Sequence, residues 1–217
     1  MSSSVSLPDP SLGQNSKAHG LLKEVFGYTS FRSGQEAVIA SILDGVSVLA
    51  VMPTGSGKSI CFQIPALLQE GLTLVVSPLV ALMEDQVAAL KLDGVAADTI
   101  NSSRPREANV DAWQRVASGE TRLLYISPER LMTERMLEAL QRLPVVQIAI
   151  DEAHCISRWG PSFRPDYESL SGLGELFPGV PLSAFTATAD EATRKDISEK
   201  LFRGPSRIFV PGFDRPN

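Results

Sequence analysis

The chain has 217 residues, of which 43% are hydrophobic, and it carries a formal net charge of −5 at pH 7. This length accommodates one α/β domain with a sizeable core and a tail. Because the net charge is negative, the chain as a whole is not a polycation. Binding to nucleic acid would therefore need a local basic groove on an acidic protein. No apolar run approaches the length of a membrane span, and we expect no membrane partner. Cys61 and Cys155 are far apart without CxxC spacing, which predicts no zinc site, no disulfide framework and a reducing compartment.

The chain begins with a Ser- and Pro-rich stretch, residues 1–16, that lacks the basic and apolar regions of a secretory signal. We expect this stretch to be a disordered tail. A helical pattern of apolar residues follows from Lys17 to Phe26. Ser33 is then expected to cap a second helix, 34–43, whose apolar residues share one buried face with Ser41 off it.

Side chains that could recognise an adenine lie at the start of the second helix and just before it. The Gln35 amide offers a hydrogen-bond donor and an acceptor, while Tyr28 and Arg32 offer flat faces for stacking. A packed entry loop explains the same residues equally well, so the stretch alone leaves both interpretations open.

The apolar run 46–51 predicts a buried strand, which leads into the sequence Met-Pro-Thr-Gly-Ser-Gly-Lys-Ser at 52–59 and a helix over 60–68. Small residues in such a loop let backbone N–H groups close around phosphates, and the helix N-terminus adds a favourable dipole. Lys58 is expected to reach the β- and γ-phosphates of ATP, and the Ser59 hydroxyl to bind Mg²⁺. The other expected nucleotide-binding residues are Thr54, Gly55, Ser56 and Gly57. A flexible Gly-rich linker is the alternative, and the apolar strand and helix on either side argue against it.

Beyond the loop, predicted strands alternate with predicted helices. The expected strands are 72–76, 96–100, 123–126, 145–150, 182–185 and 207–210. The expected helices are 79–92, 107–118, 128–143, one after Asp166, and 190–202. Alternating elements with strands that are apolar on both faces indicate a single α/β domain with a mostly parallel, doubly wound sheet. Ligands of such sheets lie at the carboxyl ends of the strands.

Two carboxylates directly follow the predicted strand 145–150. Asp151 can hold the Mg²⁺ shell, and Glu152 can orient and deprotonate an attacking water. A solvated turn is the alternative, but the phosphate loop makes the catalytic interpretation the better one. His154 is expected to be a structural hydrogen-bonding residue rather than a catalyst.

Three other predicted strands end in small polar residues: Ser77-Pro78, Ser127-Pro128 and Thr186-Ala187-Thr188. Their hydroxyls would lie at the phosphate face, although a helix cap is the commoner role for each. The stretch 157–167 is less ordinary, because Trp159, Phe163 and Arg164 alternate in a Gly- and Pro-rich loop. Such residues can stack on unpaired bases and bind phosphate, and the alternative is that the aromatic side chains anchor the core.

Together these motifs resemble the first RecA-like domain of a superfamily 2 helicase, and more narrowly the RecQ family of DNA helicases. The resemblance covers roughly residues 21–217. The matching segments are the adenine motif 26–35, the phosphate loop 52–59, motif Ia 77–86, motif Ib 125–131, motif II 151–155, the aromatic-rich loop 159–167 and motif III 185–189. The resemblance implies a RecA-like P-loop NTPase domain over 17–212, and it implies that 213–217 begin a connector to a second RecA-like domain.

The implied function is that of the ATP-binding motor half of an ATP-dependent DNA helicase, with ATP and Mg²⁺ as cofactors and a role in DNA repair and recombination. The implied substrate is single-stranded and junction-containing DNA, unwound in the 3′-to-5′ direction. Contact with DNA, or its coupling to ATP, is implied for Ser77, Pro78, Trp159, Phe163, Arg164, Thr186 and Thr188. The implied location is the cytoplasm, at the nucleoid, in a prokaryote and the nucleus in a eukaryote.

Two departures from the family pattern qualify this expectation. Pro161-Ser162 stand where the family usually has His-Asp, which bears on the strength of coupling between DNA and ATP. Motifs IV to VI, with the arginine finger, are absent, so the chain alone is expected to show almost no DNA-stimulated ATPase activity. The alternatives are a nucleotide-gated nucleic-acid-binding module that unwinds nothing and an RNA-remodelling ATPase of the DEAD-box type.

Overall fold

The computed structural model describes residues 10–157 and 164–210, and its centre is a seven-stranded sheet. The strands are β1 (Ser47–Val51), β2 (Leu72–Val76), β3 (Ala97–Ile100), β4 (Leu123–Ile126), β5 (Val145–Ile150), β6 (Leu182–Thr186) and β7 (Ser206–Phe209). Their order in the sheet is β3-β4-β2-β5-β6-β1-β7, and every neighbouring pair is parallel. The predicted α/β fold with a mostly parallel, doubly wound sheet is therefore confirmed.

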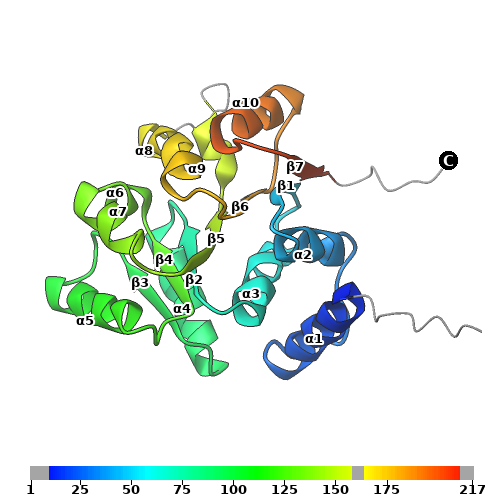
Figure 1. Ribbon diagram of the computed structural model, residues 1–217, viewed down its shortest axis with the longest axis horizontal. Coiled ribbons are helices and arrows are strands. Elements are labelled where there is room, and N and C mark those ends of the chain that lie inside the picture. The colour runs from blue at the N-terminus through cyan, green and yellow to red at the C-terminus, as the bar shows by residue number, and fades with distance from the viewer. Residues whose placement is uncertain (1–9, 158–163, 211–217) are drawn as a thin grey trace, which may run out of the picture.

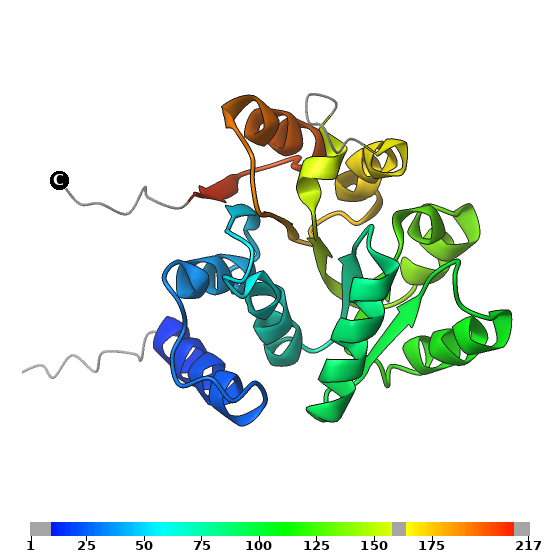
Figure 2. The same cartoon turned by 180° about the vertical axis from the view of Figure 1, so that it is seen from behind.

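Helices cover both faces of this sheet. The α-helices are α1 (Pro10–Glu24), α2 (Gln35–Leu43), α3 (Lys58–Leu68), α4 (Val80–Leu92), α5 (Arg106–Ala117), α6 (Pro128–Leu131), α7 (Glu134–Leu140), α8 (Pro165–Glu168), α9 (Leu173–Leu176) and α10 (Glu191–Leu201). Two 3₁₀ helices, η1 (Ala153–Ile156) and η2 (Ser169–Gly172), complete the elements of the described ranges. In Figures 1 and 2, α1–α3 lie together at one lower side of the view and α5–α7 at the other side, while α8–α10 lie at the top.

The hydrophobic core has two parts, one on each face of the sheet. Along β5, Ile148 and Ile150 belong to the part that packs against α5, α7 and α10, and Ala149 belongs to the part that packs against α2, α3 and α4. The same alternation holds in β1, where Leu49 faces one way and Val48 the other. Strands buried on both faces explain why their sequences read as continuous apolar runs. Within the described ranges, no helix is long and apolar enough to cross a membrane.

The N-terminal region differs from the prediction in three details. Helix α1 begins at Pro10, so the disorder expected for residues 1–16 does not extend over 10–16. This helix packs against α2 and α3, because its Leu22 is buried in the same part of the core. The N-cap of α2 is Gly34, whose φ of 83° suits glycine, and Ser33 does not cap the helix. Ser41 is buried, because its hydroxyl donates to the Ala37 carbonyl and accepts from Arg207.

The single helix predicted over 128–143 is two helices, α6 and α7. Thr133 stands at the N-cap of α7 with extended backbone angles, φ −72° and ψ 136°, which ends one helix and starts the next. Its hydroxyl donates to the Arg130 carbonyl at 3.0 Å. The helix expected after Asp166 is likewise divided among the short segments α8, η2 and α9.

A buried carboxylate, Asp98, fixes the edge strand β3 to helices of both faces. It is 3% exposed. Arg115 of α5 donates to it through Nε and Nη2, the Thr121 hydroxyl donates at 2.6 Å, and Lys91 of α4 donates at 3.1 Å. Burial alone would raise the pKa of Asp98, but these hydrogen bonds outweigh it and hold the pKa below its usual value.

We expect Asp98→Asn to lower the free energy of unfolding at neutral pH by about 1.5–3 kcal/mol, the usual contribution of hydrogen bonds to a charged group. Because the pKa of Asp98 is depressed in the folded state, its stabilisation is present above the unfolded pKa near 3.9 and is lost as pH falls through the folded pKa. Urea unfolding of wild type and variant between about pH 7 and pH 3 measures this. Asp93→Asn, at an exposed position, is the control. A stability difference that does not shrink on acidification would contradict the assignment.

Candidate active site

The predicted phosphate loop connects β1 to α3 at the carboxyl edge of the sheet. Gly55 and Gly57 adopt φ values of 79° and 78°, a region in which only glycine is unstrained. Helix α3 begins at Lys58, two residues earlier than predicted, so Lys58 and Ser59 lie in its first turn. The unpaired N–H groups and the positive dipole end of a helix N-terminus therefore face this loop, an arrangement that favours phosphate.

Two polar groups of the loop fit a phosphate. The Lys58 ammonium donates to the Met52 carbonyl at 3.3 Å, which folds its side chain back over the loop. The Ser56 hydroxyl is shielded from solvent and has no hydrogen-bond partner in the described part of the chain. A buried hydroxyl without a partner is costly, and a phosphate oxygen would supply one. The loop thus has a donor that the protein itself does not use.

The residues of the predicted adenine motif contact the phosphate loop. Gln35 is 3% exposed. Its amide nitrogen donates to the Ser56 and Gly57 carbonyls at 3.0 Å each, and its oxygen accepts from the Arg32 N–H at 2.8 Å. The Arg32 guanidinium donates to the Gly55 carbonyl. A Cβ at Gly57 would lie 2.7 Å from the Gln35 amide nitrogen, so a larger residue there would displace this amide from its hydrogen bonds to the loop.

Gln35 and Arg32 are therefore placed beside the phosphates' expected position, and they set the shape of the loop. This packing is the alternative that the sequence left open, and recognition of adenine by these residues remains a prediction. Tyr28 is 52% exposed, and its ring stacks on no other aromatic ring of the described residues.

Asp151 and Glu152 follow β5, two strands from β1 in the sheet. The Asp151 N–H donates to the Val76 carbonyl at 2.8 Å, and the Asp151 carboxylate accepts from the Glu152 N–H at 3.0 Å. Burial and the neighbouring Glu152 carboxylate raise the pKa of Asp151 to about 6, although Lys58 and the Glu152 N–H act to lower it. Two neighbouring carboxylates in a largely buried place are stabilised by a bound cation. The pair therefore fits Mg²⁺.

Glu152 has a strained backbone. Its φ of 49° is the one positive value among the non-glycine residues of the described ranges. A left-handed conformation costs a side-chain-bearing residue roughly 1–2 kcal/mol, and such residues cluster at functional sites. The conformation turns the chain sharply from β5 into η1.

His154 joins these carboxylates to the end of β6. Its Nδ1 lies 2.9 Å from the Thr186 hydroxyl and 3.2 Å from a carboxylate oxygen of Glu152. Since the Thr186 hydroxyl donates to the Thr188 carbonyl at 3.0 Å, the His154 Nδ1–H is the donor in the first contact. The Thr186 carbonyl in turn accepts from the Met52 N–H at 2.8 Å, next to the phosphate loop. His154 is thus the structural hydrogen-bonding residue that the sequence indicated.

The predicted DNA contacts are only partly placed. Ser77 is buried at the end of β2, where its hydroxyl accepts from the Leu79 N–H at 3.4 Å in a cap-like turn; Pro78 follows it at the surface of the same edge. Arg164 is exposed, and its backbone N–H donates to the Cys155 carbonyl at 2.9 Å. Trp159 and Phe163 lie outside the described residues.

Two contacts near the carboxylates were not predicted. The hydroxyl of the fully buried Tyr167 donates to the Asp151 carbonyl at 3.0 Å. The one signal in the sequence is that Tyr167 belongs to the aromatic-rich stretch that follows Asp151. Lys200 of α10 donates to the Ile156 carbonyl at 3.0 Å. Nothing in the sequence around Lys200 indicates this contact.

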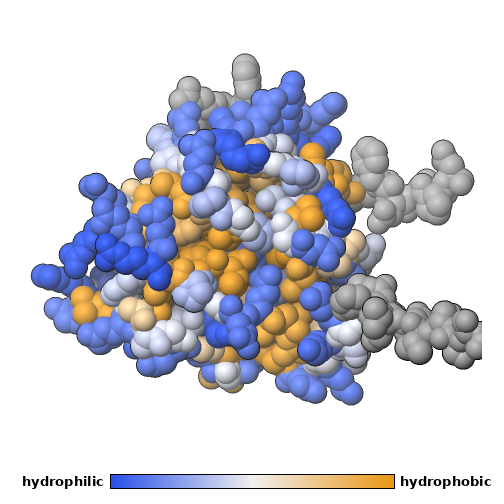
Figure 3. Space-filling model, viewed as in Figure 1, coloured by the Kyte–Doolittle hydropathy of each residue, from blue (hydrophilic) through white to orange (hydrophobic). Residues whose placement is uncertain are grey.

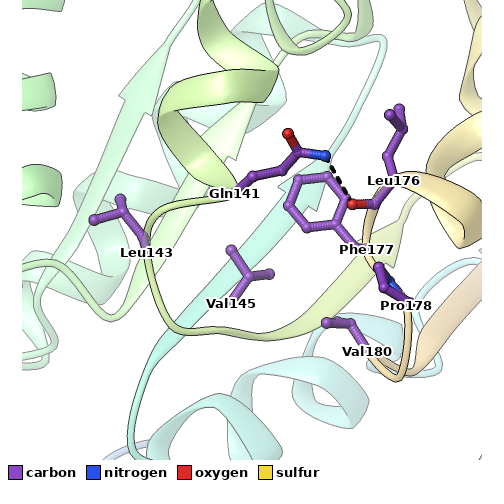
Figure 4. A pocket seen from close by; sticks show the side chains of 7 residues that line it. All are labelled: Gln141, Leu143, Val145, Leu176, Phe177, Pro178 and Val180. Atoms are coloured by element: carbon purple, nitrogen blue, oxygen red, sulfur yellow. Dashed lines mark hydrogen bonds between the residues drawn. The ribbon is translucent and has the colours of Figure 1, made fainter.

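A separate hollow lies at the opposite edge of the sheet. It has a volume of about 270 Å³ and lies beside the amino ends of β5 and β6 (Figure 4). Its lining residues are Gln141, Leu143, Val145, Leu176, Phe177, Pro178 and Val180. The Gln141 amide donates to the Leu176 carbonyl at 2.9 Å across it. Hydrophobic residues also gather near the middle of the face shown in Figure 3. Gln141 is the one residue with a polar side chain among those that line the hollow, and no cationic side chain lines it.

The fold and this site are those of a helicase ATPase domain. The family description "DEAD/DEAH box helicase" matches residues 32–197, and the chain belongs to this family. No group of three or more His, Cys, Asp or Glu side chains that could hold a metal occurs within the ranges that the structure describes.

The resemblance to RecQ helicases is confirmed by relatives that cover most of the chain. It is 50% identical over 200 residues to the ATP-dependent DNA helicase RecQ of Haemophilus influenzae, a match that covers 92% of this chain and 32% of that protein. It is 42% identical over 203 residues to the RecQ of Bacillus subtilis, covering 93% and 34%. The chain thus spans about a third of the length of these curated relatives.

A solved structure shows the same fold. The hypothetical ATP-dependent RNA helicase of Sulfolobus tokodaii superposes with a TM-score of 0.70 at 20% identity, over 90% of this chain and 57% of that one. This likeness supports the RecA-like architecture.

Proposed function

We propose that the chain is the ATP-binding motor half of an ATP-dependent DNA helicase, in which ATP hydrolysis drives translocation on DNA and its unwinding in the 3′-to-5′ direction. The observation that carries the proposal is the meeting of the phosphate loop, Asp151-Glu152 and Thr186 at the carboxyl ends of β1, β5 and β6. The similarity to two proteins named ATP-dependent DNA helicase RecQ supports DNA as the partner. Single-stranded and junction-containing DNA are part of the proposal.

In this proposal each residue of the site has a task. Lys58 and the backbone of 54–59 bind the phosphates of ATP, while Ser59 and Asp151 hold Mg²⁺. Bound Mg²⁺ neutralises charge on the phosphate oxygens. Glu152 accepts a proton from the water that attacks the γ-phosphate, as the bond to ADP breaks. Tyr28, Arg32 and Gln35 are proposed to face the adenine end, and Gln35 has a second task, because its amide nitrogen also holds the Ser56 and Gly57 carbonyls of the loop.

Coupling to DNA follows from the contacts around Glu152. His154 links Glu152 to Thr186, so a shift of the β6 end is transmitted to the carboxylate. Pro78, Thr188 and Arg164 lie at or near the same edge of the sheet, where a strand of DNA crossing the strand ends would meet them, while Ser77 lies buried beneath this edge. Trp159 and Phe163 are proposed to stack on bases, a contribution of about 1–3 kcal/mol per base.

The test is the rate of phosphate release from Mg²⁺-ATP by the longest natural form of the protein, with no nucleic acid, with single-stranded DNA, and with RNA of the same sequence. We expect DNA to stimulate the rate and RNA to do so much less. Equal or greater stimulation by RNA would instead identify an RNA-remodelling ATPase. Binding of both ATP and DNA without any hydrolysis would identify a nucleotide-gated binding module.

A further inference from the structure

Lys200, near the end of α10, donates a hydrogen bond to a backbone carbonyl of another element, the 3₁₀ helix η1. The Lys200 ammonium donates to the Ile156 carbonyl at 3.0 Å and to the Asp196 carboxylate at 3.1 Å. Ile156 is the last residue of η1, the short helix that begins next to Glu152. Lys200 therefore connects a helix that follows β6 to the segment that carries the catalytic carboxylates.

This contact has an internal comparison on the same helix. Lys195 pairs with Glu199 at the same spacing in sequence as Lys200 with Asp196, but at 3.9 Å and with side chains 76% and 66% exposed. The side chains of Lys200 and Asp196 are only 21% and 17% exposed. A shielded, charge-assisted hydrogen bond is stronger and better defined than a pair in solvent. Lys200 therefore has a fixed partner, whereas Lys195 forms an ordinary surface pair.

The Lys200 contact lies at the end of a rigid connection from Glu152. Within η1, the Cys155 N–H donates to the Glu152 carbonyl at 2.9 Å, so a displacement of Ile156 is passed to Glu152 over one turn. On the other side, α10 is fixed to the end of β6. The Asp190 side chain caps α10 by accepting from the Thr193 N–H at 2.8 Å, and Arg194 donates to the Ala189 carbonyl at 2.9 Å.

Two links thus join the segment 151–156 to the segment that runs from β6 into α10. The first is His154 with Thr186, and the second is Lys200 with the Ile156 carbonyl. The neighbouring Cys155 carbonyl accepts from the Arg164 N–H at 2.9 Å, which fixes Arg164 to η1 next to the carbonyl that Lys200 holds. One route from Arg164 to the carboxylates therefore passes next to the carbonyl that Lys200 holds, and a second passes through Tyr167, whose N–H donates to the Arg164 carbonyl and whose hydroxyl donates to the Asp151 carbonyl.

We propose that Lys200 is a positioning residue that fixes the Ile156 carbonyl, and through η1 the orientation of Glu152, when DNA stimulates ATP hydrolysis. The inference rests on the proposed function, because it concerns the DNA-dependent part of the rate. Lys200 touches neither nucleotide nor metal in this scheme.

The test is Lys200→Met in the longest natural form of the protein, with Lys195→Met as the matched control. Lys200→Met keeps the aliphatic stem and removes the donor. We expect the DNA-stimulated kcat to fall roughly 3–30-fold, the range for residues that couple two sites. The kcat without DNA and the KM for ATP should stay within about twofold, since the phosphate loop is untouched. Lys195→Met should behave as wild type, and Lys200→Arg should restore most of the stimulation.

The outcomes separate the inference from the function on which it rests. A wild-type protein that DNA does not stimulate would refute the proposed function. A stimulated wild type whose Lys200→Met variant is stimulated equally would refute the role of Lys200 alone. If Lys200→Met lowered kcat by the same factor with and without DNA, the role of Lys200 would be merely structural, and the inference would also be overturned. Should Lys200→Met not fold, Lys200→Gln, which keeps a donor too short to reach Ile156, takes its place in the same comparison.

Discussion

Glu152→Gln is expected to lower the DNA-stimulated kcat for ATP hydrolysis by about 10²–10⁴-fold, the contribution of a positioned general base. The substitution keeps the length of the side chain and its left-handed backbone conformation, and an amide oxygen can still accept from His154. Only the ability to accept the proton of the attacking water is lost. ATP affinity should therefore change little, because Glu152 is not part of the phosphate loop.

Phosphate release and equilibrium binding of a fluorescent ATP analogue measure the two effects separately. Glu175→Gln is the control, since that carboxylate is 72% exposed and pairs with Arg203 at the surface. A Glu152→Gln variant that hydrolyses ATP at the rate of the control would show that another group is the base.

Lys58→Ala should abolish nucleotide-dependent activity by weakening binding itself. The Lys58 ammonium lies over the phosphate loop, 3.3 Å from the Met52 carbonyl, where it can reach the phosphates. Loss of one charge-assisted hydrogen bond, about 1.5–3 kcal/mol, corresponds to a roughly 10- to 150-fold loss of ATP affinity. The fold should persist, because Lys58 is only partly buried and alanine favours the first turn of α3.

Calorimetric titration with Mg²⁺-ATP measures the affinity, and far-UV circular dichroism checks the fold. Lys23→Ala, at an exposed position of α1, serves as the control. Wild-type affinity or turnover in Lys58→Ala would exclude 52–59 as the phosphate loop.

The parts of the fold and site that the sequence predicted correctly are those that local patterns determine. Strand β1, the glycines at 55 and 57, and the presence of a helix after them follow from apolar runs and from conformations that only glycine adopts freely, although α3 starts at Lys58, two residues before the predicted start. Asp151-Glu152 could be placed because they directly follow a buried strand, and parallel strands bring their carboxyl ends to one edge.

The parts that could not be predicted depend on partners far away in the sequence. Ser41 is buried because Arg207, 166 residues later, donates to its hydroxyl. Gln35 turned out to hydrogen-bond the phosphate-loop carbonyls, 21 and 22 residues away, a contact that its helical position does not reveal. The Ile156 carbonyl has its donor on α10, 44 residues later. The periodicity of apolar residues and the residue types of turns predict only local structure, not contacts between residues far apart in the sequence.

A crystal structure of the chain with Mg²⁺ and a non-hydrolysable ATP analogue tests the central claim most directly. The account predicts the phosphates against the backbone of 54–59, with Lys58 on the β- and γ-phosphates. It also predicts a metal between Ser59 and Asp151, with oxygen ligands at about 2.0–2.1 Å when they bind Mg²⁺ directly. A nucleotide bound in the apolar hollow near Leu143 and Phe177, or phosphates that leave this loop empty, would contradict it.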